Sequence, residues 1–269
     1  MSEVKYGNVL NIKKEVFSYG LRRTLFTSYS EISANAFIFD FEKATDYINW
    51  AEKDFENLCI VEDGSLVLKY NNEDYPVKKG EVFKIFPGQA PTLIPSPFAS
   101  VLSIQMPSKN SNFDGEVLSK LKIVHTELVP SKVYEYETLG QEVVTCNYSP
   151  GLGLLKFTFP NKIPIHKHPY SGRLIRPISG LGFSYVAPDR YDMNKNTFSL
   201  FPKGTIHTNG PLPGEVFTLW AIQMPWVDSK IDIENIAGDK DFVQYIESEP
   251  PKPLWKTKSD LERVIKKLS

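Results

Sequence analysis

Two stretches of this chain repeat each other, and the repeat limits the possible fold more than any other feature of the sequence. The first stretch reads EVFKIFPGQAPT over residues 81–92, and SIQMP follows it at 103–107. The second reads NTFSLFPKGTIH over 196–207, and AIQMP follows it at 221–225. The two copies are separated by roughly 115 to 118 residues, which is the length of a domain and not of a solenoid unit. The chain is therefore predicted to contain two similar domains.

Each half also contains short runs of β-branched and aromatic residues bounded by turn residues, as all-β folds do. Such runs at regular spacing predict barrels or sandwiches rather than alternating strands and helices. The chain end differs, because Ser259 and Glu262 form a capping box followed by apolar residues at helical spacing. We predict a short C-terminal helix there, packed on a barrel. Strands are expected over residues 67–70, 82–86, 154–159, 183–186, 198–201 and 216–222.

The charge balance gives no sign of a polyanionic partner. The chain has 31 Lys and Arg against 32 Asp and Glu, for a formal net charge of −1. We therefore expect no nucleic-acid partner and no membrane partner. The sequence has neither a signal-peptide pattern nor a membrane span, so a cytoplasmic location is predicted. Cys59 and Cys146 form no CxxC pair, and Cys59 lies in an apolar run that predicts a buried, reduced thiol.

Three of the four histidines lie in one arrangement with the spacing of metal ligands. His166 and His168 are two residues apart, so on a strand both side chains lie on the same face. His207 follows after a predicted hairpin and a Pro-x-Gly turn. Inside a barrel, these segments can bring three imidazoles to one divalent transition metal. Fe(II), Mn, Ni, Zn and Cu all suit such a site. The fourth histidine, His125, is expected to be an ordinary surface or core residue.

These residues resemble the two motifs of the cupin superfamily. The first motif of that family is His-x-His, then Glu after three or four residues, then Gly after six more. This chain has HKH at 166–168, Arg173 where the family has Glu, and Gly180. The second motif is Pro-x-Gly, two residues and His, with Asn three residues later. This chain has PKGTIH at 202–207, with Asn209 two residues on.

The resemblance implies a bicupin, an all-β chain of two tandem jelly-roll barrels (the double-stranded β-helix) with a three-His metal site in the C-terminal barrel. The motifs cover about residues 160–211, and the repeat extends the resemblance more weakly to 40–107. The likeness specifies the fold better than the activity, since cupins host several enzyme classes and also non-enzymatic binders. We divide the chain into an N-terminal arm (1–35), a degenerate cupin barrel (36–125), a metal-binding cupin barrel (126–228) and a helical tail (229–269).

Arg173 stands where the family usually has a metal-binding Glu, and a guanidinium cannot ligate a metal. Three interpretations follow. Arg173 clamps an anionic substrate through two hydrogen bonds, it pairs with a protein carboxylate and is structural, or it marks a site that has lost its metal. Family members without the Glu exist with three-His iron sites, including ring-cleaving dioxygenases of the gentisate type, to which the likeness is general.

The first half lacks the ligands. Trp50, Glu52 and Asn57 stand at the repeat positions of His166, His168 and Arg173, and Thr92 or Pro91 replaces His207. We therefore predict that the N-terminal barrel binds no metal. In the C-terminal barrel, Tyr170 and Arg173 are candidate catalytic residues. The candidate substrate-binding residues are Arg173, Arg176, Tyr185, Trp220 and Gln223.

The sequence therefore predicts a metal-dependent enzyme that acts on a small, anionic organic molecule. Oxygen-dependent cleavage by Fe(II) is favoured, with Arg173 or Arg176 orienting the substrate. The alternative enzyme class is metal-assisted isomerase, lyase or dehydratase chemistry, in which the ion polarises an oxygen and Tyr170 moves a proton. The second alternative is a non-catalytic module that binds a small molecule or a sugar. A homodimer is compatible with each of these.

Overall fold

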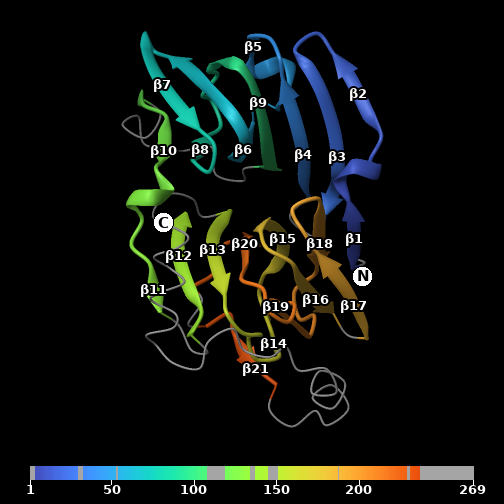
Figure 1. Cartoon of the computed structure of the whole chain (residues 1–269). Coiled ribbons are helices and arrows are strands. Elements are labelled where there is room, and N and C mark those ends of the chain that lie inside the picture. Colours follow the sequence, from blue (N-terminus) through green and yellow to red (C-terminus); the bar gives the residue numbers. More distant parts are fainter. Residues whose placement is uncertain are drawn as a thin grey trace. The chain divides into compact units, whose positions relative to one another are not determined.

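A computed structural model of the chain describes residues 4–29, 33–52, 54–107, 119–133, 137–144, 151–186, 188–228 and 231–236. Its elements are antiparallel strands and three 3-10 turns, so the predicted all-β fold is confirmed. Contacts divide the chain into two units: residues 11–129, and residues 1–10 with 130–269 (Figure 1). No helix of the described residues is long and apolar enough to cross a membrane.

The unit of residues 11–129 is built on a nine-stranded sheet. Its strand order is β10-β8-β6-β9-β4-β3-β2, with β5 on β9 and β7 on β6. Buried aromatic and aliphatic side chains of β4, β6, β8 and β9 form its core. The strands are β2 Lys14–Phe17, β3 Gly20–Tyr29, β4 Ala34–Phe41, β5 Thr45–Asp46, β6 Phe55–Tyr70, β7 Glu73–Lys78, β8 Val82–Ile85, β9 Thr92–Pro107 and β10 Lys122–Val124, with 3-10 turns η2 Tyr47–Asn49 and η3 Thr126–Leu128.

The second unit contains two sheets. The seven-stranded sheet has the order β1-β18-β15-β20-β13-β12-β11, and the five-stranded sheet has the order β17-β16-β19-β14-β21. The strands are β1 Lys5–Asn8, β11 Lys132–Val133, β12 Leu139–Val144, β13 Gly153–Phe159, β14 His166–Lys167, β15 Gly172–Ser179, β16 Gly182–Val186, β17 Asp189–Met193, β18 Thr197–Phe201, β19 His207–Pro211, β20 Phe217–Met224 and β21 Glu234–Asn235, and the 3-10 turn η1 is Val9–Asn11.

The sequence repeat is also a repeat of strand register. In the first unit Asn57 of β6 lies opposite Gln105 of β9, and in the second Arg173 of β15 lies opposite Gln223 of β20. The turn glycines match as well: Gly64 and Gly180 have φ values of 72° and 76°. A Cβ on either glycine would lie 2.1 Å or 1.8 Å from a backbone carbonyl oxygen, so only glycine fits at both turns. The equivalence of Asn57 and Arg173 therefore rests on register as well as on sequence.

The ends of the chain are organised differently from the expected arm and tail. Within residues 1–35, β1 pairs with β18 of the second unit, whereas β2 and β3 join the sheet of the first. Within 229–269, β21 pairs with β14, the strand that carries His166. The strands β1, β2 and β21 are short and lie at sheet edges, where they have little hydrophobic pattern of their own, which is why the sequence did not reveal them. The helix expected after Pro250 lies outside the described residues, as does Cys146. Cys59 is buried and free, as predicted.

Candidate metal centre

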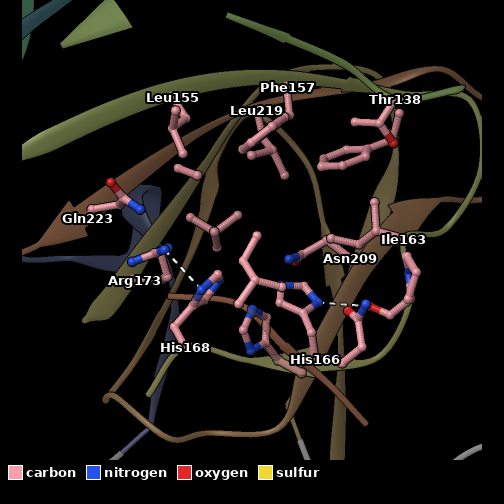
Figure 2. A pocket seen from close by; sticks show the side chains of 17 residues that line it. Thr138, Leu155, Phe157, Ile163, His166, His168, Arg173, Asn209, Leu219 and Gln223 are labelled. Atoms are coloured by element: carbon pink, nitrogen blue, oxygen red, sulfur yellow. Dashed lines mark hydrogen bonds between the residues drawn. The ribbon is translucent and has the colours of Figure 1, made fainter. Parts of the chain in front are cut away.

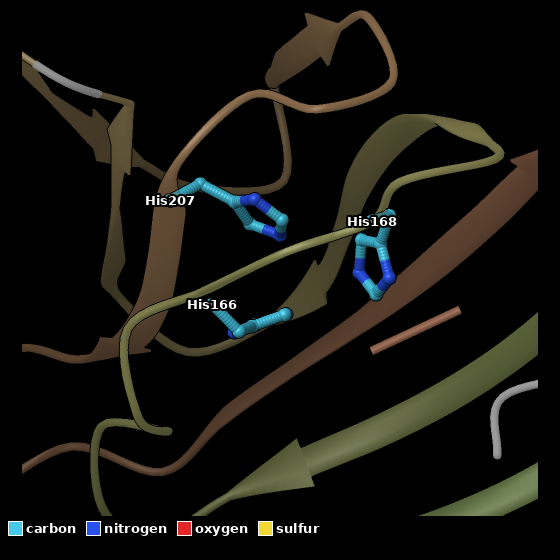
Figure 3. A group of neighbouring side chains, drawn as sticks. All are labelled: His166, His168 and His207. Carbon is cyan, nitrogen blue, oxygen red and sulfur yellow. The ribbon is translucent and has the colours of Figure 1, made fainter. Parts of the chain in front are cut away.

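The three predicted ligands lie together in the second unit. His166 on β14 is the direct cross-strand partner of His207 on β19, and His168 directly follows the end of β14. The ring centroids are 4.3 to 5.1 Å apart, and one ligand atom from each ring lies within 4.8 Å of the other two (Figure 3). All three side chains are buried. The sequence spacing thus predicted a real cluster of imidazoles.

The backbone fixes the tautomer of each imidazole. His166 Nδ1 lies 2.8 Å from the Pro164 carbonyl oxygen, and His207 Nδ1 lies 2.9 Å from that of Thr205. His168 Nδ1 lies 2.5 Å from the carbonyl oxygen of Asp232. A carbonyl oxygen only accepts, so each Nδ1 carries the proton and donates it. Each Nε2 therefore keeps its lone pair, which is the arrangement that metal-ligating histidines have.

Burial keeps the three imidazoles neutral. It lowers the pKa of His166 from 6.5 to about 4, and the pKa of His207 falls well below 6.5 for the same reason. Burial also lowers the pKa of His168 strongly, with the positive charge of Arg173 adding to the effect. A neutral imidazole is the form that ligates a metal, so the cluster is ready to bind one at neutral pH without losing protons first.

Arg173 reaches the cluster but has a carboxylate of its own. Its side chain is 3% exposed, and an NH2 nitrogen lies 2.9 Å from Asp232 Oδ2. The Ser171 hydroxyl accepts a further hydrogen bond from the guanidinium and donates one to Asp232. The same guanidinium is 3.0 Å from His168 Nδ1, the contact drawn in Figure 2. Because that nitrogen already donates to Asp232, the contact is electrostatic rather than a hydrogen bond.

Asp232 is the residue of this site that the sequence analysis missed. It is fully buried, its Oδ1 accepts the Tyr170 N–H at 2.9 Å, and its main-chain oxygen accepts the His168 proton. Asp232 thus offsets the Arg173 charge and orients a ligand. It removes the difficulty of a lone guanidinium beside a divalent ion. No motif marks it, since it lies 59 residues after Arg173 in what was expected to be tail.

A cavity of about 390 Å³ opens beside the histidines, between the two sheets of this unit (Figure 2). His166, His168 and Arg173 lie on one side of it, and His207, the strand partner of His166, also lines it. The opposite wall is apolar and consists mainly of inward-facing residues of β13 and β20. It includes Leu155, Phe157, Leu219 and Ala221. The cavity has the size and the mixed lining of a small-molecule site.

Of the predicted substrate-binding residues, Arg173 and Gln223 line the cavity. Trp220 and Arg176 are buried but pair with each other on strands β20 and β15, and neither is a lining residue. The reason is the two-residue period of a strand. Successive side chains of a strand point to opposite faces of the sheet. Gln223 and Trp220 are three residues apart, as are Arg173 and Arg176, so only one residue of each pair faces inward. Arg176 instead donates to the Thr197 carbonyl oxygen at 2.9 Å.

The two predicted tyrosines also lie outside the cavity lining. Tyr185 packs with Phe183 in a separate small core, and Tyr170 has a side chain that is 59% exposed. The cavity instead presents three polar residues that were not selected as site residues, Thr138, Asn209 and Asn235. Asn209 follows His207 by two positions on β19, so strand parity was the signal that would have identified it.

Comparison with known proteins supports the fold. No family model matches the chain, and no curated protein matches its sequence. Among solved structures, it resembles protein Ylba from E. coli, with TM-score 0.68 and 9% identity, over 83% of this chain and 91% of that one. It resembles the Lactobacillus farciminis oxalate decarboxylase formate complex, with TM-score 0.64 and 8% identity, over 93% and 95%. It also resembles a cupin 2 conserved barrel domain protein from Leptotrichia buccalis, with TM-score 0.59 and 14% identity, over 82% and 96%.

These neighbours and the strand register define the chain as a two-barrel protein of cupin fold, with a three-His cluster in its C-terminal barrel. The residues present fit a divalent transition metal. Three neutral imidazoles offer free Nε2 atoms, and the cavity beside them leaves room for further ligands.

Proposed function

We propose that the C-terminal barrel is the active site of a metal-dependent enzyme that acts on a small, anionic organic molecule. The observation that carries this proposal is the set of three buried imidazoles, each with Nδ1 bonded to a backbone carbonyl and Nε2 left free. Structural imidazoles in a core have no need of such a shared orientation beside a cavity. A catalytic metal site needs both the free nitrogens and the open space.

In this proposal each part of the chain has a defined task. His166, His168 and His207 hold the ion, and the Arg173–Asp232 pair holds His168 in place. Gln223 donates to the polar group of the substrate, because its side chain lines the cavity beside Arg173. The apolar wall excludes water from the reacting groups. Arg173 is thus a positioning residue here, and Tyr170 has no task.

Among reactions, oxygen-dependent cleavage with Fe(II) is the leading hypothesis. Iron, when bound, supplies the redox chemistry that lets dioxygen cleave a substrate bond. The protein residues supply binding and orientation. The test is dioxygen uptake by the Fe(II)-loaded protein with a library of carboxylates. Uptake that depends on His207 supports the proposal. Turnover without dioxygen in the presence of Mn, Ni or Zn would favour isomerase or lyase chemistry, and tight binding without any turnover would favour a binding module.

A further inference from the structure

The charges around the cavity favour an anionic ligand. Each of the three imidazoles bonds through Nδ1 to a backbone carbonyl oxygen, and Arg173 is balanced by Asp232 at 2.9 Å. Among the described residues that line the cavity there is no Asp or Glu. A divalent ion held by the histidines would therefore keep its full charge in a buried site, and only a ligand can neutralise it.

The cavity is much larger than its polar part requires. A volume of about 390 Å³ corresponds to roughly a dozen water molecules. Along β20 the inward residues run Leu219, Ala221, Gln223, so that only the last, opposite Arg173, is polar. Leu155 and Phe157 on the neighbouring strand β13 extend the apolar wall. An ionic head fits at the histidines, and the remaining wall suits an apolar body.

Three buried polar atoms in this cavity have no hydrogen-bond partner within the described residues. They are Gln223 Nε2, Asn209 Oδ1 and Thr138 Oγ1. Buried polar groups are normally paired, so unpaired ones on residues that line the same cavity point to a ligand with its own polar atoms. Gln223 lies beside Arg173, whereas Thr138 lies across the cavity from both (Figure 2). The ligand is thus polar at the head and carries a hydrogen-bonding group farther along its body.

We infer that this cavity binds a monocarboxylate with an apolar, aryl or branched body, and not a ligand as small as oxalate. This inference rests on the proposed function, because the metal binds the head. The inference adds which ligand body the side chains of the cavity wall favour. Gln223 donates to the carboxylate at the histidine end, and the side chains of β13 and β20 contact the body.

The test uses calorimetric binding to the Zn(II)-loaded full chain, since zinc has no redox chemistry and prevents oxidative turnover. The probes are pyruvate, phenylpyruvate and oxalate. Burial of the phenyl group is expected to make phenylpyruvate bind roughly tenfold to a hundredfold more tightly than pyruvate. Oxalate is expected to bind no more tightly than pyruvate. Equal affinities for the two oxo acids, or tightest binding of oxalate, would overturn the inference.

A variant that fills the apolar wall sharpens the test. Leu219→Phe is expected to remove the preference, so that phenylpyruvate binds this variant no more tightly than pyruvate does. Leu181→Phe is the matched control, because Leu181 is 46% exposed and does not line the cavity. If Leu219→Phe does not fold, the wild-type series still decides. Metal content is measured first: a chain that binds no zinc contradicts the proposed function, whereas a zinc-loaded chain without the phenyl preference contradicts only this inference.

Discussion

The two barrels share a strand register but use their interiors differently. In residues 11–129 the core is packed with aromatic rings, among them Phe39, Tyr47 and Trp50. Asn57, the counterpart of Arg173, donates there to the Tyr47 hydroxyl group. In the C-terminal barrel the corresponding space is a cavity of about 390 Å³ beside three histidines.

The same difference is seen at the glutamine that occurs in both repeats, Gln105 in the first barrel and Gln223 in the second. Gln105 Nε2 lies 3.4 Å from the Trp50 carbonyl oxygen and from Ser103 Oγ, so its amide is used within the core. Gln223 Nε2 in the other barrel has no partner among the described residues. One framework therefore holds either a cluster of packed aromatic rings or a cavity, according to the size and polarity of a few inward positions.

The largest expected effect comes from removing a ligand. His207→Ala should lower metal affinity well beyond the roughly tenfold to hundredfold loss typical of removing a residue that only supports a ligand. His125→Ala is the control, because this fourth histidine is exposed, belongs to the other unit and contacts Glu81. Isothermal titration with Zn(II) or Co(II) measures both. If the metal affinity of His207→Ala were unchanged, the claim that the metal site lies in the C-terminal barrel would be wrong.

The next effect concerns the buried ion pair. Arg173→Met leaves the buried Asp232 carboxylate without its cationic partner, which should lower the free energy of unfolding by about 3 to 5 kcal/mol. Arg22→Met in the other barrel should cost no more than about 1 kcal/mol, because its partner Glu15 is 40% exposed. Urea denaturation compares them. If Arg173 mainly clamps substrate, stability will change little and substrate affinity will fall instead.

A pH prediction follows from His166. Burial holds its pKa at about 4 in the fold, against 6.5 for the ordinary side chain. Between these values the unfolded chain binds a proton that the folded metal-free chain does not, so stability falls as pH drops from 6.5 towards 4. His166→Gln should lessen this loss by about 1.4 kcal/mol per pH unit. Denaturation of metal-free protein at several pH values measures the slope, and equal slopes in both proteins would contradict the assignment.

The smallest expected effect is a difference in stability between variants of the two repeated glutamines, Gln105 and Gln223. Gln105→Met removes hydrogen bonds within a packed core and should cost about 1 kcal/mol of stability. Gln223→Met removes an amide nitrogen that has no partner among the residues that the structure describes, so the metal-free protein should be as stable as wild type or more so. Thermal unfolding of the two variants side by side provides the comparison. A larger cost for Gln223→Met would mean that this amide is used within the protein.

The sequence predicted those parts of the molecule that local patterns determine. The repeat predicted two barrels, and the spacing of His166, His168 and His207 predicted the cluster. Strand alternation places the side chains of Gln223 and Trp220 on opposite faces of β20. The sequence alone does not say which of the two faces points into the barrel, unless one inward residue is already known. Asp232 was beyond prediction, because the pairing of β21 with β14 depends on tertiary contacts of a segment that carries no motif.

The central claim is that only the C-terminal barrel is built to hold a metal, and its most direct test is the metal stoichiometry of the full chain. We predict that elemental analysis after loading with Fe(II) or Zn(II) and removal of free metal will find one ion per chain, and that this ion will be lost in the His166→Ala variant. A value near zero would contradict the metal centre. A value near two, or one ion that survives in the variant, would place a site where the account predicts none.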